Sequence, residues 1–242
     1  MQDVMNQQTD AKESAKIESA FEPDTYELSK GQKFYCVIKA LFDFLFALVA
    51  VILLSPVYLI TAIAIKIDSK GPVFFVQPRI GKNGKIFKCI KFRSMSQNAN
   101  HAIPGYEYRD AEAHVTKVGA FIRKSSIDEL PQFFNILAFQ MSLIGYRPSQ
   151  SNEKTLNDAR EAYNMYQIRP GISGWAQVNG RDKLAAQPAK KAKFDAYYLK
   201  HLSPWLDIKI FFMTITSVFK HSNVCEGVVE DPDATVKEPT SK

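Results

Sequence analysis

The sequence contains few of the side chains that commonly hold metals or form disulfides. Its three cysteines, Cys36, Cys89 and Cys225, lie far apart and lack the spacing of a metal site or a disulfide framework. We therefore expect free thiols in a reducing compartment. The four histidines also lack the spacing of metal ligands, and no internal repeat is found. The polar, acidic start of the chain does not have the pattern of a cleavable signal peptide.

Charge is absent from one long stretch, the 22 residues from Phe44 to Ile65. A straight helix of that length would extend about 33 Å, which is enough to cross the core of a bilayer. Pro56 lies in the middle of the stretch, and a proline inside a helix removes a hydrogen bond and kinks or breaks the helix. The pattern predicts two helices with a break at Ser55-Pro56. The hydroxyl of Ser55 is suited to bind a backbone carbonyl that the proline frees.

Basic residues flank the apolar stretch on both sides. Lys33 and Lys39 precede it, and Lys66 and Lys70 follow it. Short basic flanks favour the cytoplasmic side of a membrane, and a single crossing cannot place both flanks there. The flanks therefore favour a re-entrant anchor that enters and leaves on the same side. The alternatives are a kinked transmembrane helix and a buried hairpin in a soluble protein.

The two ends of the chain lack the basic excess of its middle. Residues 1–30 carry 3 basic and 7 acidic side chains and residues 221–242 carry 2 and 5, which leaves a net charge of +13 on residues 31–220. Such a basic body suits anionic partners. No nucleic-acid-binding module is recognisable, so nucleic acid is not an expected partner. We expect an acidic, disordered tail over 1–30, a membrane helix–break–helix over 31–70, a cytoplasmic domain with interfacial C-terminal helices over 71–220, and an acidic tail over 221–242.

The remaining patterns predict a mostly helical α/β fold with one small β-hairpin. Two β-rich runs flank Asn83-Gly84, which is a strong turn signal. A polar loop is expected over 96–116 and an irregular, glycine-rich segment over 169–181. The helices are expected over 116–124, 128–140 and 152–166, and as a pair over 188–220 that breaks near Ser203-Pro204.

Asp128 and Glu129 are adjacent carboxylates at the start of the helix expected over 128–140, with Asp128 near the N-cap and Glu129 in the first turn. Acidic residues at that position often cap the helix or interact with its dipole, so a purely structural role is one reading. The other reading is chemical: one carboxylate attacks phosphorus and the other helps to hold a divalent cation. Arg123 and Lys124 lie just upstream, where they could bind phosphate oxygens.

Further basic side chains are candidates for phosphate binding. Lys91 and Arg93 share one face of the predicted second strand, although a solvated basic strand would look the same. Arg147, Arg169 and Arg181 lie in glycine- and proline-rich loops, and a guanidinium on a stiff loop suits bidentate phosphate binding. Trp175 could stack on a ring, anchor at the interface or be buried.

The order of several segments resembles the bacterial sugar transferase family. These segments are the apolar stretch with its Ser-Pro break, then PVFFVQPRIGKNGKIFKCIKFRSM, then VGAFIRKSSIDELPQFFNILAFQMSLIGYRP, and then IRPGISGWAQVNGR. The similarity extends from about Lys39 to Lys220. Within this family, the sequence is most similar to the small monotopic phosphoglycosyl transferases.

The resemblance implies an activity and a set of site residues. Members transfer a sugar 1-phosphate from a UDP-sugar to undecaprenyl phosphate on the cytoplasmic face of the bacterial inner membrane and release UMP. By resemblance, Asp128 is the nucleophile that carries a covalent phosphosugar, and Glu129 helps to bind Mg²⁺. Ser55 and Pro56 form the break of the membrane helix. The implied phosphate contacts are Lys91, Arg93, Arg123 and Arg147.

The chain departs from the family pattern at Tyr146, where members usually have a proline. The resemblance implies a UDP-sugar, polyprenyl phosphate and membrane lipid as partners, and leaves open a second copy of the chain or later glycosyltransferases. Two rival functions remain. A glycosyltransferase would release UDP without a covalent aspartate, and a non-catalytic membrane adaptor would keep its function after Asp128→Asn.

Overall fold

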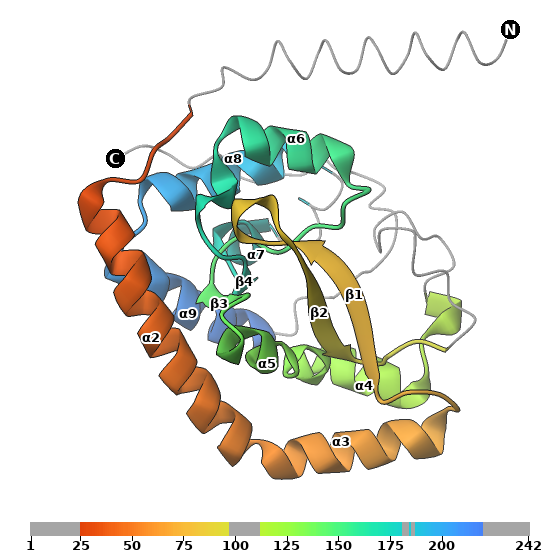
Figure 1. Ribbon diagram of the computed structural model, residues 1–242. Helices are drawn as coiled ribbons and strands as arrows, with labels where there is room; N and C mark the ends of the chain where they lie inside the picture. Colours follow the sequence, from red (N-terminus) through yellow and green to blue (C-terminus); the bar gives the residue numbers. More distant parts are fainter. Residues whose placement is uncertain (1–24, 97–111, 181–183, 185–186, 220–242) are drawn as a thin grey trace, which may run out of the picture.

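The computed structural model describes residues 25–96, 112–180, 184 and 187–219. The apolar helices α2 (Lys30–Leu53) and α3 (Ser55–Asp68) form a bent arm along one side of the molecule, and the other elements lie within the bend (Figure 1). This part of the chain is mostly helical with two small two-stranded sheets, which confirms the predicted class. The acidic tail after residue 220 and most of the polar loop lie outside the described residues.

The elements that follow the arm are short, and they alternate with loops. In chain order they are β1 (Phe74–Ile80), η1 (Lys82–Gly84), β2 (Ile86–Phe92), η2 (Glu112–His114), α4 (Lys117–Lys124), η3 (Ile127–Glu129), α5 (Gln132–Leu137), β3 (Ser142–Ile144), α6 (Lys154–Ala162), η4 (Met165–Gln167), β4 (Gly171–Ser173), α7 (Trp175–Gly180), α8 (Pro188–Lys200) and α9 (Pro204–Phe219).

The predicted break in the apolar stretch lies at Leu54, directly before Ser55. Leu54 has φ −89° and ψ 4°, and its amide donates to the carbonyl of Ala50 at 2.9 Å. Pro56 stands in the first turn of α3, where a helix needs no amide donor. The proline therefore begins a new helix instead of interrupting one, and the chain turns sharply between α2 and α3 (Figure 1).

The exposed side of the arm is apolar, and its buried side is partly polar. α2 buries Asp43 and Ala47, and α3 buries Thr61 and Ile65. The exposed hydrophobic side chains of the arm include Phe34, Val37, Leu41, Phe42, Leu45, Ile52, Leu53, Leu59, Ile60, Ile63 and Ile67. Surface helices of soluble proteins show the opposite arrangement, and a large apolar patch in water is unfavourable. Of the described helices, α2 has the length and composition of a membrane span. The arm therefore has the character of a membrane-associated element, which argues against a buried hairpin.

A buried polar network fastens α2 to α9. Lys39 Nζ lies 2.7 Å from Asp207 Oδ2 and 3.6 Å from Asp43 Oδ2. The hydroxyls of Tyr35 and Tyr198 donate to the Asp207 carboxylate at 2.6 Å each. Buried charges are tolerated when they are paired in this way. The network therefore fixes the start of the arm to the body of the protein.

The end of the arm is also fixed to the body. Arg93, just after β2, is buried and donates to the carbonyls of Ser69 and Lys70, the residues that follow α3. Asp68 Oδ2 accepts the amide of Val118 at 3.0 Å, at the start of α4. Both ends of the bent arm thus contact the same body.

The predicted hairpin is confirmed. β1 and β2 pair antiparallel from Phe74 opposite Phe92 to Ile80 opposite Ile86. The connection contains Asn83 with φ 57° and Gly84 with φ 70°, and these left-handed values explain the Asn-Gly pair.

Three predicted segments differ from the structure. The helix expected over 152–166 ends earlier, since α6 covers only Lys154–Ala162 and the separate turn η4 follows it. The helix expected over 128–140 is shorter: α5 covers only Gln132–Leu137, and a separate 3₁₀ turn, η3, holds the carboxylate pair. The segment 169–181 is not irregular, since it contains β4 and α7. β4 pairs in parallel with β3, with Ser142 opposite Gly171, and this long-range pairing leaves no periodic pattern in either short strand.

The main core lies between α8, α9 and the loops that follow β3. It includes Ile144, Tyr146, Met165, Trp175, Phe194, Tyr198, Leu199, Leu206 and Ile210. Pro204 begins α9, so the break predicted near Ser203-Pro204 is confirmed. Leu28, from the end of the expected acidic tail, is also buried in this core. α9 exposes Trp205, Ile208 and Phe212 on its other side, which continues the apolar surface of the arm.

Candidate active site

The carboxylate pair lies in η3, a tight turn between α4 and α5. Ser126 opens the turn with φ 56°, and Glu129 N donates to Ser126 O at 3.2 Å. The helix α5 begins with Pro131 at its N-cap position, and no side chain caps either η3 or α5. Asp128 and Glu129 therefore do not serve as caps, which removes one of the two grounds for a purely structural pair.

Glu129 holds two cations at one oxygen. Its Oε1 lies 2.6 Å from Arg147 Nη2 and 3.0 Å from Lys91 Nζ. The side chain of Glu129 is only 15% exposed. Burial alone would raise the pKa of Glu129, but Arg147 and Lys91 outweigh burial and hold that pKa well below its usual range. Glu129 is thus ionised at neutral pH and orients both cations.

Asp128 has the opposite electrostatic character. Burial raises the pKa of Asp128 to about 6, Glu129 adds to this, and Lys91, Arg147 and Arg123 oppose it. At pH 7 the carboxylate is still about nine-tenths ionised. An ionised carboxylate with an unfavourable environment and cations close by is suited to react with a phosphorylated substrate.

The predicted basic residues do not all lie together. Lys91 and Arg147 contact Glu129 directly, and Arg123 is close enough to Asp128 to affect its pKa. Arg123 Nε donates to Ser94 Oγ at 2.8 Å, which orients its guanidinium. Arg93 instead donates to the end of α3, including Ser69 Oγ at 2.9 Å. A phosphate contact by Arg93 stays a prediction, while its contacts in the structure attach the arm to the hairpin.

The loop that carries Arg147 is held rigidly by elements that the sequence pattern did not reveal. A Cβ atom on Gly174 would lie 1.9 Å from Gly145 O, so the two glycines allow the loops after β3 and β4 to interlock. Pro148 O accepts a hydrogen bond from Arg79 at 3.2 Å. Arg147 therefore projects from a fixed backbone, as a specific phosphate contact requires.

The departure at Tyr146 has a structural explanation. Tyr146 is buried, and the guanidinium of Arg160 lies 4.9 Å from its ring centre. Arg160 in turn donates to Asp195 Oδ2 at 2.6 Å, in a pair that is almost completely buried. Tyr146 thus anchors the loop through its ring instead of through a proline.

The other candidates from the loops have contacts of their own. Arg169 donates to the backbone carbonyl of Phe139 at 2.8 Å. This contact does not involve Asp128 or Glu129. Trp175 is buried and stacks on Tyr197 with ring centres 5.2 Å apart. Arg181 lies outside the described residues. Arg169 and Trp175 are therefore assigned no direct role.

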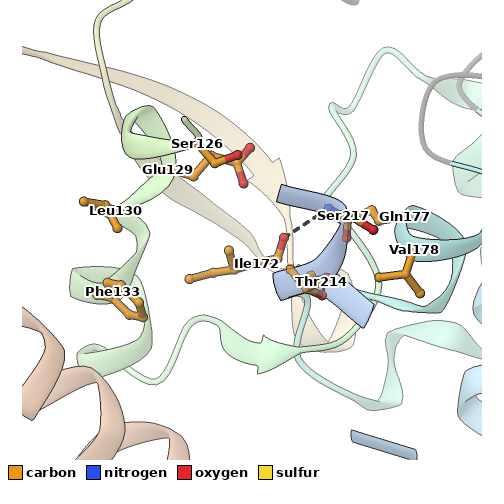
Figure 2. Close-up of a pocket in the computed structure, with 10 residues that line it drawn as sticks. Ser126, Glu129, Leu130, Phe133, Ile172, Gln177, Val178, Thr214 and Ser217 are labelled. Carbon is orange, nitrogen blue, oxygen red and sulfur yellow. Dashed lines mark hydrogen bonds between the residues drawn. The ribbon is translucent and has the colours of Figure 1, made fainter. Parts of the chain in front are cut away.

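A pocket of about 120 Å³ opens beside Glu129. It lies between η3 and α5 on one side and β4, α7 and α9 on the other (Figure 2). Its lining is Ser126, Glu129, Leu130, Phe133, Ile172, Ser173, Gln177, Val178, Thr214 and Ser217. The sequence analysis did not find this pocket, because its walls come from four separate segments.

The carboxylate pair is also the candidate cation site. No group of three or more Asp, Glu, His or Cys side chains that could hold a metal is found in the described part of the chain. Mg²⁺ in phosphate-handling enzymes typically takes only one or two carboxylates and completes its shell with water and substrate phosphate. The oxygens of Asp128 and Glu129 fit that pattern of binding.

The fold and site define a membrane-associated protein with a carboxylate pair set among cations. The chain belongs to the bacterial sugar transferase family, whose model matches residues 34–221. This confirms the resemblance noted in the sequence.

Named relatives agree with this membership. One relative is the UDP-N-acetylgalactosamine-undecaprenyl-phosphate N-acetylgalactosaminephosphotransferase of Aeromonas hydrophila. It is 46% identical over 188 residues, which are 76% of this chain and 44% of the relative. A UDP-glucose:undecaprenyl-phosphate glucose-1-phosphate transferase from Escherichia coli K12 is 38% identical over 76% of this chain and 40% of the relative. The chain thus spans less than half the length of these relatives. An uncharacterized sugar transferase, EpsL, from Bacillus subtilis is 36% identical, with 83% of this chain and 95% of the relative covered.

Proposed function

We propose that this protein transfers a sugar 1-phosphate from a UDP-sugar to undecaprenyl phosphate and releases UMP, as a membrane step of bacterial glycan assembly. The observation that carries the proposal is the pair in η3: Asp128, whose pKa burial raises to about 6, next to a Glu129 that holds Lys91 and Arg147 in place. The names of the relatives support the same donor and acceptor classes.

The proposed reaction has two displacements at one phosphorus atom. A carboxylate oxygen of Asp128 bonds to the β-phosphorus of the UDP-sugar, and the bond from that phosphorus to the oxygen bridging the two phosphates breaks. UMP leaves with the electron pair. A phosphate oxygen of the polyprenyl acceptor then bonds to the same phosphorus, and the bond to Asp128 breaks. Asp128 is restored, and the product is a polyprenyl diphosphate sugar.

The cations around the pair have distinct tasks in this proposal. Lys91 and Arg147 point at Glu129 and can share their remaining donors with phosphate oxygens, because both are held by a rigid strand or loop. Arg123, oriented by Ser94, lies on the Asp128 side. When bound at Glu129 and Asp128, Mg²⁺ would neutralise charge on the donor diphosphate.

The arm gives a reason for the location of the site. We infer that α2 and α3 enter one leaflet and return, so that both basic flanks lie on the cytoplasmic face of the inner membrane. Two features support this: both ends of the arm contact the same body, and Ile52 and Leu53 at the bend are exposed. The active site then lies at the level of the lipid phosphates, where a water-soluble donor and a lipid acceptor can meet.

Intact-protein mass spectrometry without lipid acceptor tests the chemistry. Purified protein with Mg²⁺ is mixed with UDP-glucose, UDP-galactose or their N-acetylated counterparts, and a mass gain of one sugar phosphate is expected with at least one donor. Asp128→Asn should show no gain. Turnover with undecaprenyl phosphate but no adduct and UDP as product would favour a glycosyltransferase, and unchanged function of Asp128→Asn would favour an adaptor.

Topology is tested separately by cysteine labelling. In a variant without native cysteines, Lys33→Cys and Pro72→Cys place one exposed thiol near each end of the arm. A membrane-impermeant reagent should label both from the cytoplasmic side only. Labelling from opposite sides would show that the arm crosses the membrane.

A further inference from the structure

The pocket beside Glu129 contains a polar atom without a partner. Gln177 Oε1 is buried and accepts no hydrogen bond from the residues that the structure describes. Its Nε2 donates to Ile172 O at 3.1 Å, which fixes the orientation of the amide. Gln177 stands on α7, across the pocket from Ser126 and Glu129 (Figure 2). A buried oxygen without a donor costs free energy, so the position indicates a ligand group that donates to it.

The other polar groups of the pocket also offer acceptors more readily than donors. Thr214 Oγ1 and Ser217 Oγ donate to carbonyls of their own helix, Ile210 O and Met213 O, at 2.8 Å each. Thr214 Oγ1 already accepts from Ser173 Oγ at 2.6 Å, which leaves Ser217 Oγ as the more available acceptor of the two. The opposite wall carries the apolar side chains of Leu130 and Phe133, and Val178 adds apolar surface beside Gln177. A ligand with several donors and an apolar face matches this lining.

We propose that this pocket binds the sugar ring of the donor, and that a hydroxyl or amide N–H of the sugar donates to Gln177 Oε1. The inference rests on the proposed function. The pocket begins at Glu129, next to the Asp128 nucleophile, and the sugar of the donor is attached through one oxygen to the phosphorus that Asp128 attacks. An isoprenoid chain has no donor, so it would leave Gln177 Oε1 buried and unpaired.

The test measures the covalent step alone, in the absence of lipid acceptor. Adduct formation is followed for wild type and Gln177→Met with the UDP-sugar that loads wild type, across donor concentrations. Gln177→Met keeps the length of the side chain and removes the acceptor. We expect a loss of about 10-fold in the apparent second-order rate, since a neutral hydrogen bond contributes about that much. The inhibition constant of UDP, which lacks the transferred sugar, should stay unchanged.

A matched control separates this role from a structural one. Asn179 lies on the same helix outside the pocket lining, and its Nδ2 donates to Trp175 O at 2.8 Å. Asn179→Leu loses a comparable amide–carbonyl bond and should keep wild-type donor kinetics. If Gln177→Met does not fold, Val178→Phe fills the pocket instead and should raise the donor concentration needed for half-maximal loading without changing UDP inhibition.

Each outcome decides the proposal. Deoxy analogues of the loading donor identify the contacted group: one analogue should react about 10-fold more slowly with wild type and no more slowly with Gln177→Met. Unchanged donor loading in both pocket variants would overturn the inference and indicate bound water at Gln177. A change only in the dependence on undecaprenyl phosphate would overturn it in favour of the lipid. Failure of wild type to load any donor would refute the proposed function itself.

Discussion

Asp128→Asn should stabilise the folded protein while it abolishes sugar-phosphate loading. Burial holds the pKa of Asp128 at about 6, above its ordinary value of 3.8. The ionised side chain therefore destabilises the fold at pH 7.5 by about 3 kcal/mol, at most. Asparagine resembles the neutral acid in size and carries no charge, so it removes this cost. Enzymes commonly hold reactive groups at such a cost in stability.

The size of the effect depends on pH. Because the folded pKa is the higher one, the destabilisation is absent below about pH 4, grows as pH rises from 4 to 6, and is complete above 6. The apparent Tm of Asp128→Asn in lipid nanodiscs should thus exceed that of wild type by several degrees at pH 7.5, at about 2–4 °C per kcal/mol. The difference should shrink at pH 5.

A neighbouring substitution provides the control. Glu129→Gln removes a charge that two cations require, so it should lower the apparent Tm at pH 7.5. If Asp128→Asn lowers the Tm, or raises it equally at pH 5 and 7.5, the argument from burial is wrong. Asp128 would then be a stabilising residue of the turn and not a strained nucleophile.

The remaining predictions concern other parts of the site. The rate of loading should fall about 10-fold between pH 7 and pH 5, because Asp128 becomes protonated through its pKa of about 6; a rate that is flat over this range would refute an ionised Asp128 as nucleophile. Arg147→Ala should lose at least about 100-fold in turnover with its membrane insertion retained, and Arg147→Lys should recover little, since a lysine cannot replace the guanidinium fork; full activity of either variant in a UMP-release assay would remove Arg147 from the site. Chelation with EDTA should stop loading and added Mg²⁺ should restore it, and loading that persists in EDTA would exclude a divalent cation from the first step. Tyr58→Phe removes the 2.7 Å bond from the Tyr58 hydroxyl to Leu130 O, so it should slow loading several-fold without changing the amount of protein in the membrane fraction; loading equal to wild type would show that α3 does not position η3.

The sequence was sufficient to predict the elements whose signals are local. The Ser-Pro break, the Asn-Gly hairpin and the proline at the start of α9 each depend on a few adjacent residues, and all three are present. Local signals also pointed to Asp128 and Glu129 as a candidate pair, and the family resemblance supplied the catalytic roles expected of them. They did not reveal that the pair lies in a separate 3₁₀ turn, since the left-handed Ser126 has no marker such as glycine.

Contacts between distant segments could not be read from the pattern. Arg93 alternates with Lys91 along the strand, which suggested a common phosphate-binding face. In the structure Lys91 contacts Glu129, whereas Arg93 contacts the end of α3. The difference arises because α3 returns to the hairpin, and no property of the strand alone indicates that return. The pocket at Gln177 was missed for the same reason.

The polar residues inside the arm explain how an apolar element can position a chemical site. Lys39 and Asp43 would be costly in lipid if they faced outward, so the pairing of Lys39 with both Asp43 and Asp207 fixes the rotation of α2 about its axis. That rotation places Phe46 of α2 against Phe133 of α5, with ring centres 6.2 Å apart. α5 directly follows the turn that holds the carboxylate pair. In the membrane geometry that we propose, the depth of the arm would therefore set the height of the carboxylate pair, through the ion-pair network of Lys39 and the contact between Phe46 and Phe133.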